Sequence, residues 1–169
     1  MKTVRSSRGK LAGIAFSIPS LLLAATALAS LQGCNYEAVD GAPAIAVGDK
    51  FYGALKHRDG NAALSFFSPA FRSSEKEWPR LLGSMQEKSG AVASAELRGA
   101  SLVARDDSPC YFLDYAIKRE SLATDEGLLV CRAAGGTNWE IAGHVLTRLD
   151  SKQSIWGGVV PTGIGTAAR

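Results

Sequence analysis

The hydrophobic pattern of the chain changes at Gly90. Before this residue, apolar side chains recur at three- and four-residue steps, the spacing of a helix with one buried face. After it, apolar and polar residues alternate, the spacing of a strand with one buried face. Helices followed by a run of antiparallel strands predict an α+β domain in which the helices cover one face of a sheet.

Three helices are predicted before Gly90. The first spans residues 42–60, and the second, NAALSFFSPAF, is capped by Asn61 and breaks around Pro69. A third helix contains Trp78, Leu81, Leu82 and Met85, and it follows Ser74 and Glu77 at capping-box spacing.

About four strands are predicted after Gly90, and they occupy residues 93–104, 110–120, 126–134 and 138–149. In the first, Leu97 and Leu102 fall on opposite faces of a regular strand, so a bulge is expected at Gly99 or Ala100. In the second, one face carries Tyr111, Leu113, Tyr115 and Ile117. In the fourth, alternation places Trp139, Ile141 and Val145 opposite Glu140, His144 and Arg148.

This order of elements resembles the nuclear transport factor 2-like, or cystatin-like, superfamily. The residues that carry the resemblance are FYGALKHRDGNAALSFFSPAF, EWPRLLGSMQEKSGA and NWEIAGHVL. The resemblance implies an α+β cone over residues 44–150, with helices inside a curved antiparallel sheet. Enzymes of that superfamily, including ketosteroid isomerase-like proteins and dehydratases, work inside the cone, but none of their catalytic motifs carries over to this chain.

The first 34 residues have the organisation of an export signal. A cationic start, MKTVRSSRGK, precedes an uncharged run at residues 11–31 and the small-residue ending QGC. The run Leu31-Gln32-Gly33-Cys34 resembles the lipobox of bacterial lipoproteins. The resemblance implies removal of residues 1–33 and lipid on Cys34, while an uncleaved membrane anchor is the alternative. Asn35 after the lipidated residue points to the outer membrane facing the periplasm.

Removal of this signal changes the charge of the protein. Four of the 19 basic residues lie before Leu11, and the first of the 16 acidic residues is Glu37, so the chain from Cys34 onward carries 15 basic and 16 acidic residues. This balance gives no reason to expect nucleic-acid binding. Residues 34–43 are then a lipidated tether that holds the domain to the membrane.

Export makes a disulfide the favoured state of the two remaining cysteines. Cys110 and Cys131 lie on strands predicted to be antiparallel neighbours, which brings them within bonding distance, and the alternative is two buried free thiols. With two scattered histidines, His57 and His144, the chain offers no cluster with metal-ligand spacing. We therefore expect neither a metal nor another cofactor.

Candidate ligand contacts are few. Tyr52, Tyr111, Tyr115 and Trp139 are pocket candidates, although each is also a plausible wall residue of the core. Alternation places His144 on the outer face, in an exposed polar stripe or a dimer face. No catalytic residue is assigned, because no Ser-His-Asp order, phosphate loop or HExxH motif occurs.

Residues 151–169 form a Gly-rich tail that is too apolar for an ordinary linker. Trp156 either folds back onto its own domain or belongs to a segment that adds a strand to a partner.

Taken together, the sequence predicts a noncatalytic lipoprotein that binds or scaffolds an envelope protein, a second copy of itself or a small apolar ligand. The alternative is a cofactor-independent enzyme of the ketosteroid isomerase or dehydratase type that uses the cone.

Overall fold

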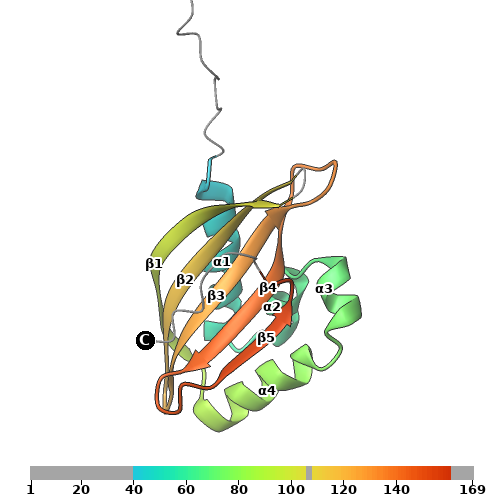
Figure 1. Cartoon of the computed structure of the whole chain (residues 1–169). Coiled ribbons are helices and arrows are strands. Elements are labelled where there is room, and N and C mark those ends of the chain that lie inside the picture. Colours follow the sequence, from blue (N-terminus) through green and yellow to red (C-terminus); the bar gives the residue numbers. More distant parts are fainter. Residues whose placement is uncertain (1–39, 106–107, 161–169) are drawn as a thin grey trace, which may run out of the picture. The chain divides into compact units, whose positions relative to one another are not determined.

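Four helices precede a five-stranded antiparallel sheet in the computed structural model, which describes residues 40–105 and 108–160 (Figure 1). The helices are α1 (Ala42–Lys56), α2 (Gly60–Ser65), α3 (Pro69–Ser74) and α4 (Trp78–Ser89). The strands are β1 (Val92–Arg105), β2 (Ser108–Arg119), β3 (Ala123–Arg132), β4 (Trp139–Arg148) and β5 (Ser154–Gly158). The predicted α+β class is confirmed, with one helix and one strand more than expected.

The helix boundaries differ from the prediction because other residues cap them. Asp59, not Asn61, caps α2, since its Oδ1 accepts the N–H of Ala62 at 2.9 Å. Pro69 does not end the second helix but opens α3, where its missing N–H costs nothing.

The predicted capping box before α4 is also wrong. The hydroxyl of Ser74 donates backwards to the carbonyl of Phe71, and Glu77 makes no side-chain cap.

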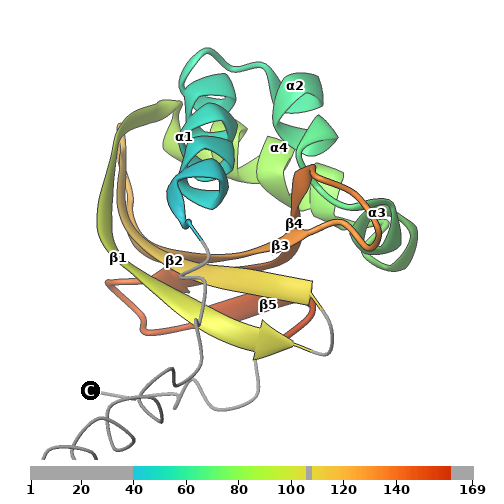
Figure 2. The ribbon, with the colours of Figure 1, turned by 90° about the horizontal axis from the view of Figure 1, so that it is seen from above.

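The strands pair in chain order, β1-β2-β3-β4-β5, so each is joined to the next by a hairpin. The register of β1 on β2 shifts between Leu97 and Gly99, which confirms the predicted bulge and places the extra residue at Arg98. The register of β3 on β4 shifts at Ala142, which has no partner on β3. Bulges bend and twist a strand, and the sheet curves around α1, α2 and α4 on its concave side, with α3 beside β4 (Figure 2).

The fifth strand comes from the segment predicted to be a tail. Residues 154–158 pair with β4, and Trp156 lies opposite Val145. The segment thus folds back onto its own domain, one of the two possibilities that the sequence left open. Residues 161–169 lie outside the described part of the chain.

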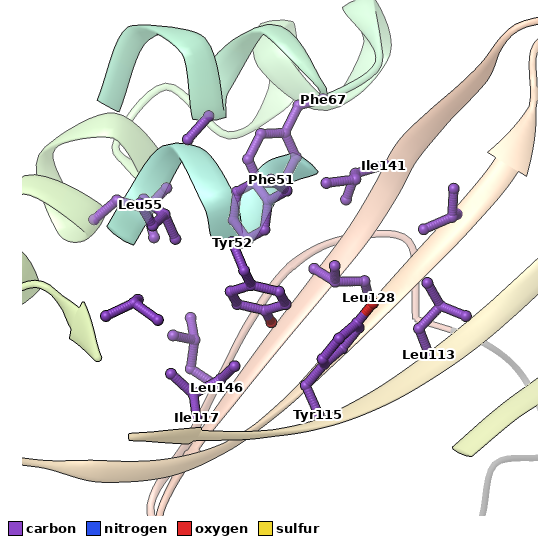
Figure 3. Close-up of a cluster of buried hydrophobic side chains, with 14 of the residues drawn as sticks. Phe51, Tyr52, Leu55, Phe67, Leu113, Tyr115, Ile117, Leu128, Ile141 and Leu146 are labelled. Carbon is purple, nitrogen blue, oxygen red and sulfur yellow. The ribbon is translucent and has the colours of Figure 1, made fainter. Parts of the chain in front are cut away.

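The core lies between α1 and the concave face of the sheet (Figure 3). Phe51 of α1 packs edge-on against Phe67, with ring centroids 5.4 Å apart, and Tyr52 lies 4.7 Å from Tyr115 of β2 by the same measure. A glycine permits this approach, because a Cβ at position 48 of α1 would lie 2.5 Å from the hydroxyl of Tyr115. The predicted inner face of β2 is confirmed, since Leu113, Tyr115 and Ile117 are all buried.

Candidate functional site

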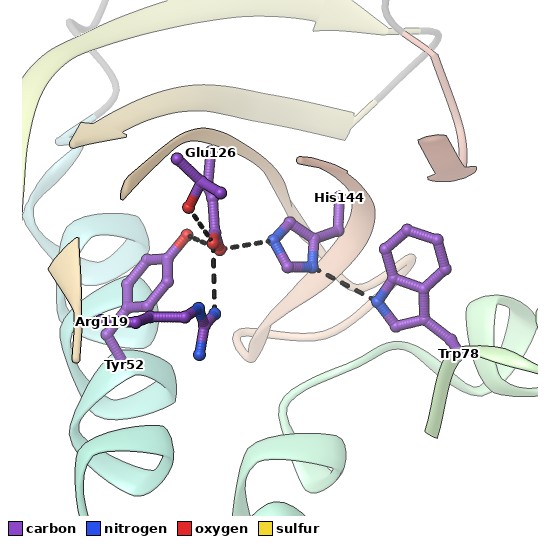
Figure 4. Close-up of polar contacts among 6 residues, drawn as sticks. Tyr52, Trp78, Arg119, Glu126 and His144 are labelled. Carbon is purple, nitrogen blue, oxygen red and sulfur yellow. Dashed lines mark hydrogen bonds and ion pairs between the residues drawn. The ribbon is translucent and has the colours of Figure 1, made fainter. Parts of the chain in front are cut away.

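A carboxylate is buried in the middle of this apolar interior. Glu126 of β3 is 1% exposed, and four side chains donate hydrogen bonds to it (Figure 4). Its Oε1 accepts from Thr124 Oγ1 at 2.7 Å and from Arg119 Nη2 at 3.2 Å. Its Oε2 accepts from Tyr52 Oη and from His144 Nε2, both at 3.2 Å.

The sheet register explains why these groups meet. Glu126 lies opposite Tyr115 on β2, and Thr124 lies two residues earlier on the same inward face of β3. Arg119 follows Ile117 on the inward face of β2. Tyr52 comes from α1, and its hydroxyl contacts the Glu126 carboxylate from the helical layer. Burial of a charged residue is tolerated here because an opposite charge and three further donors replace the lost water.

The environment keeps the carboxyl ionised. Burial raises the pKa of Glu126, whereas the hydrogen bond from His144, the charge of Arg119 and the hydrogen bond from Thr124 are among the effects that lower it, and the net result is a pKa below the ordinary value. Burial and the neighbouring Glu126 carboxylate raise the pKa of Tyr52 well above its ordinary value. Tyr52 therefore remains a neutral hydrogen-bond donor.

Trp78 extends the network to the opposite side of His144. The indole Nε1–H of Trp78 donates to His144 Nδ1 at 3.3 Å, so this nitrogen acts as an acceptor and carries no proton. The remaining ring proton then lies on Nε2, which faces Glu126. The contacts thus assign His144 to its neutral Nε2–H tautomer, held between an indole and a carboxylate.

The position of His144 corrects the sequence prediction. The residue is 1% exposed and faces the core, not an exposed polar stripe or a dimer face. The reason is the bulge at Ala142, because one extra residue reverses the alternation of every residue after it. Ile141 and His144 therefore share the inner face, while Val145, predicted to join Ile141, lies on the outer face beside Trp156.

The pocket candidates do not gather around one cavity. Tyr52 and Tyr115 are buried side by side, and the hydroxyl of Tyr115 donates to Asp49 at 3.2 Å. Tyr111 and Trp139 form a separate half-buried pair, with ring centroids 6.0 Å apart. None of the four lines the three main cavities of the described residues.

Sequence reasoning missed Arg119 and Glu126. The alternation of β2 already placed Arg119 on the face of Leu113, Tyr115 and Ile117. The same reasoning for β3 places Glu126 on the face of Leu128 and Val130. Both residues were thus predicted to lie on core-facing sides of neighbouring strands, and they carry opposite charges. This was a signal for a buried ion pair, because charged residues are rarely buried unless they are paired.

The two cysteines of β2 and β3 are directly opposite each other. Cys110 pairs with Cys131 in the strand register, and their sulfur atoms lie at disulfide distance, as the sequence predicted. The bond lies on the outer face of the sheet, away from the Glu126 network. Cys34, the predicted lipidation site, and the whole predicted signal at residues 1–33 lie outside the described residues.

A groove beside α4 lies close to the network. It has a volume of about 450 Å³ and lies between α4 and the hairpins that join β2 to β3 and β4 to β5. Thr124 lies in its wall and separates it from Glu126. Neither Glu126 nor His144 lines this groove or the other two cavities.

Residues 40–105 and 108–160 contain no cluster of acidic, histidine and cysteine side chains that could hold a metal ion. Among the helices of this part of the chain, none has the length and apolar character needed to cross a bilayer.

The chain was also compared with known proteins, and no family model, curated protein or solved structure matches it.

Proposed function

We propose that the protein is a noncatalytic, lipid-anchored binding domain of the bacterial cell envelope, with a nuclear transport factor 2-like cone. The fold supports this assignment because its helices lie on the concave side of a curved antiparallel sheet (Figure 2). An envelope protein, a second copy of the chain or a small apolar ligand is the binding partner.

The filled interior of the domain is the observation that supports a noncatalytic role. Phe51, Tyr52, Tyr115, Leu128 and Ile141 occupy the space that a substrate needs in a cone enzyme (Figure 3). The Glu126 carboxylate already accepts hydrogen bonds from four side chains of the domain itself. We therefore interpret the network as a device that fixes the helices to the sheet.

Anchoring rests on the sequence. The lipobox-like Leu31-Gln32-Gly33-Cys34 follows an uncharged run and a basic start, and lipid on Cys34 holds a protein stably when two or more acyl chains are present. The Cys110–Cys131 pair is compatible with this location, because disulfides persist in oxidising compartments. The predicted outer-membrane destination, facing the periplasm, is part of the same proposal.

Membrane fractionation of Cys34→Ala tests the anchor. We expect the wild-type protein to incorporate labelled palmitate and to sediment with outer membranes. The variant takes up no label and keeps the mobility of the unprocessed chain. Unchanged processing and labelling of Cys34→Ala would refute the lipoprotein assignment. Cys131→Ala is the matched control, since it removes another cysteine and should leave labelling intact.

One observation favours the alternative of a cone enzyme. A carboxylate, an imidazole and a phenol converge on one point, as acid–base chemistry requires. Two features weigh against it: the pKa of Glu126 is lowered, which makes it a poorer base, and Glu126 lines none of the three main cavities of the described residues. Proton exchange at the α-carbon of a ketosteroid, lost in Glu126→Gln, is the activity that would establish this alternative.

A further inference from the structure

The groove beside α4 has an apolar floor built from four elements. Its apolar lining residues are Leu81 and Met85 of α4, Leu122 of the β2–β3 hairpin, Leu146 of β4 and Ile155 of β5. Ile155 is 45% exposed, which is unusual for a large apolar side chain in this domain. From residue 81 to residue 88, α4 rises about 10 Å, so the floor is long enough for an extended chain of several methylenes.

The charges around this floor are unequal. Arg148 and Asp150 form a two-pronged pair, with Nε–Oδ1 and Nη2–Oδ2 distances of 3.0 and 2.6 Å, so each largely neutralises the other. Lys88, in the last turn of α4, lines the same groove and makes no ion pair among the described residues. Four uncharged polar residues, Ser84, Ser89, Ser121 and Gln153, also line the groove. The groove therefore presents hydrocarbon along its floor, uncharged polar groups beside it and one unpaired positive charge.

We infer that this groove binds a long-chain fatty acid, with the acyl chain on the apolar floor and the carboxylate at Lys88. Burial of each methylene contributes about 0.8 kcal/mol, so the chain supplies most of the affinity. The ammonium selects an anionic head. Met85 suits such a ligand because its flexible side chain can adapt to the position of the chain.

This inference rests on the proposed binding role, for which it names a ligand, but it does not depend on the anchor. The groove is also distinct from the Glu126 network, because Thr124 is the one member of that network that lines it. Thr124 in the groove wall turns its hydroxyl toward Glu126 and so presents no donor to the ligand.

A photoreactive dodecanoate with a diazirine at the end of its chain tests the inference. The full-length lipidated protein is placed in phosphatidylcholine vesicles, irradiated with the probe and digested, and labelled peptides are identified by mass spectrometry. We expect labelling to concentrate on the peptides that contain Met85 and Ile155, and unlabelled dodecanoate to compete with it. Labelling spread along the chain without competition would overturn the inference.

Two substitutions, each with a control, measure separately how the apolar floor and the charge of Lys88 contribute to ligand binding. Ile155→Asp should reduce labelling about tenfold, and Lys88→Glu about fivefold. Leu102→Asp, at an apolar side chain that is 41% exposed in β1, and Lys50→Glu on the exposed surface of α1 should leave labelling unchanged. Equal loss in a test variant and its control would contradict the assignment to this groove.

A dodecyl ammonium probe of the same length tests the head group. It should label the groove at least about fivefold less than the carboxylate probe, because Lys88 repels it. Equal labelling would overturn the role of Lys88. The same experiment on Cys34→Ala keeps the two proposals distinct, because this variant should lose its membrane anchor and keep groove labelling. A Cys34→Ala protein that stays anchored would refute the lipoprotein assignment alone, and absence of groove labelling in both wild type and variant would refute the fatty-acid site alone.

Discussion

His144 Nε2 lies 3.2 Å from the carboxylate of Glu126, and each residue is 1% exposed. The pair links β4 to β3, Trp78 extends it to α4, and Tyr52 extends it to α1. A polar network thus crosses the interior and contacts both layers of the fold. Such a network favours one arrangement of the helices over others, because each displaced member leaves a buried polar group without a partner.

Removal of the central charge is expected to destabilise the domain strongly. Glu126→Gln keeps the shape of the side chain but leaves the guanidinium of Arg119, which is 2% exposed, without its counter-charge. We expect a loss of about 3–5 kcal/mol in the free energy of unfolding, measured by urea denaturation. Glu120→Gln is the control: Glu120 pairs with Arg58 on the surface, and its loss should cost at most about 1 kcal/mol.

The same carboxyl gives stability a defined pH dependence. Its pKa is lowered in the folded protein, so the unfolded chain binds the proton more readily and acid favours unfolding. The stabilisation is complete above the ordinary value of 4.5 and is lost as the pH falls through the lower folded value. The difference in unfolding free energy between wild type and Glu126→Gln should therefore be constant above that pH and shrink below it. A difference that grows in acid would contradict this sign.

Two glycines of α1 form a matched pair for a test of packing. Gly48→Ala places a methyl group 2.5 Å from the hydroxyl of Tyr115, so we expect destabilisation of about 1–3 kcal/mol. At Gly53 nothing lies within 4 Å of the added carbon. Gly53→Ala should therefore stabilise the domain by about 0.5–1 kcal/mol through helix propensity alone. Equal effects of the two substitutions in thermal or urea unfolding would refute the close approach of α1 and β2.

The cysteine pair should contribute to stability through the unfolded state. Cys110 and Cys131 are 21 residues apart in the sequence, and closing a loop of this size is worth about 3 kcal/mol. The double variant Cys110→Ala/Cys131→Ala should lose that amount in urea denaturation. Wild type in reductant should behave in the same way, and insensitivity to reductant would argue against a bond in the exported protein.

Much of the fold could be predicted because two simple periodicities dominate the sequence. Alternation alone gave the inner face of β2, and Gly99 signalled the bulge that lies one residue earlier, at Arg98. The cysteine pairing followed from the expected hairpin of β2 and β3. These features depend on local spacing and on neighbours in sequence.

The site could not be predicted in the same way, because one bulge decides it. Gly143 lies next to the bulged Ala142, and like Gly99 in β1 it could have indicated a bulge. Regular alternation was assumed across β4 instead, and it predicted the wrong face of the sheet for His144. The partners of His144 come from α1, β3 and α4, and these contacts depend on how the helices lie on the sheet. Spacing within one strand carries no such information.

A closed interior is the central claim, and the two histidines of the chain test it directly. His57 is exposed at the end of α1, whereas His144 is 1% exposed. The measurement is carbethoxylation of the native protein by diethyl pyrocarbonate, read from the two histidine peptides by mass spectrometry. We predict rapid modification of His57 and protection of His144 until the protein is unfolded in urea. Modification of His144 at the rate of His57 would contradict the account, because it would mean that the cone is open to a small reactant.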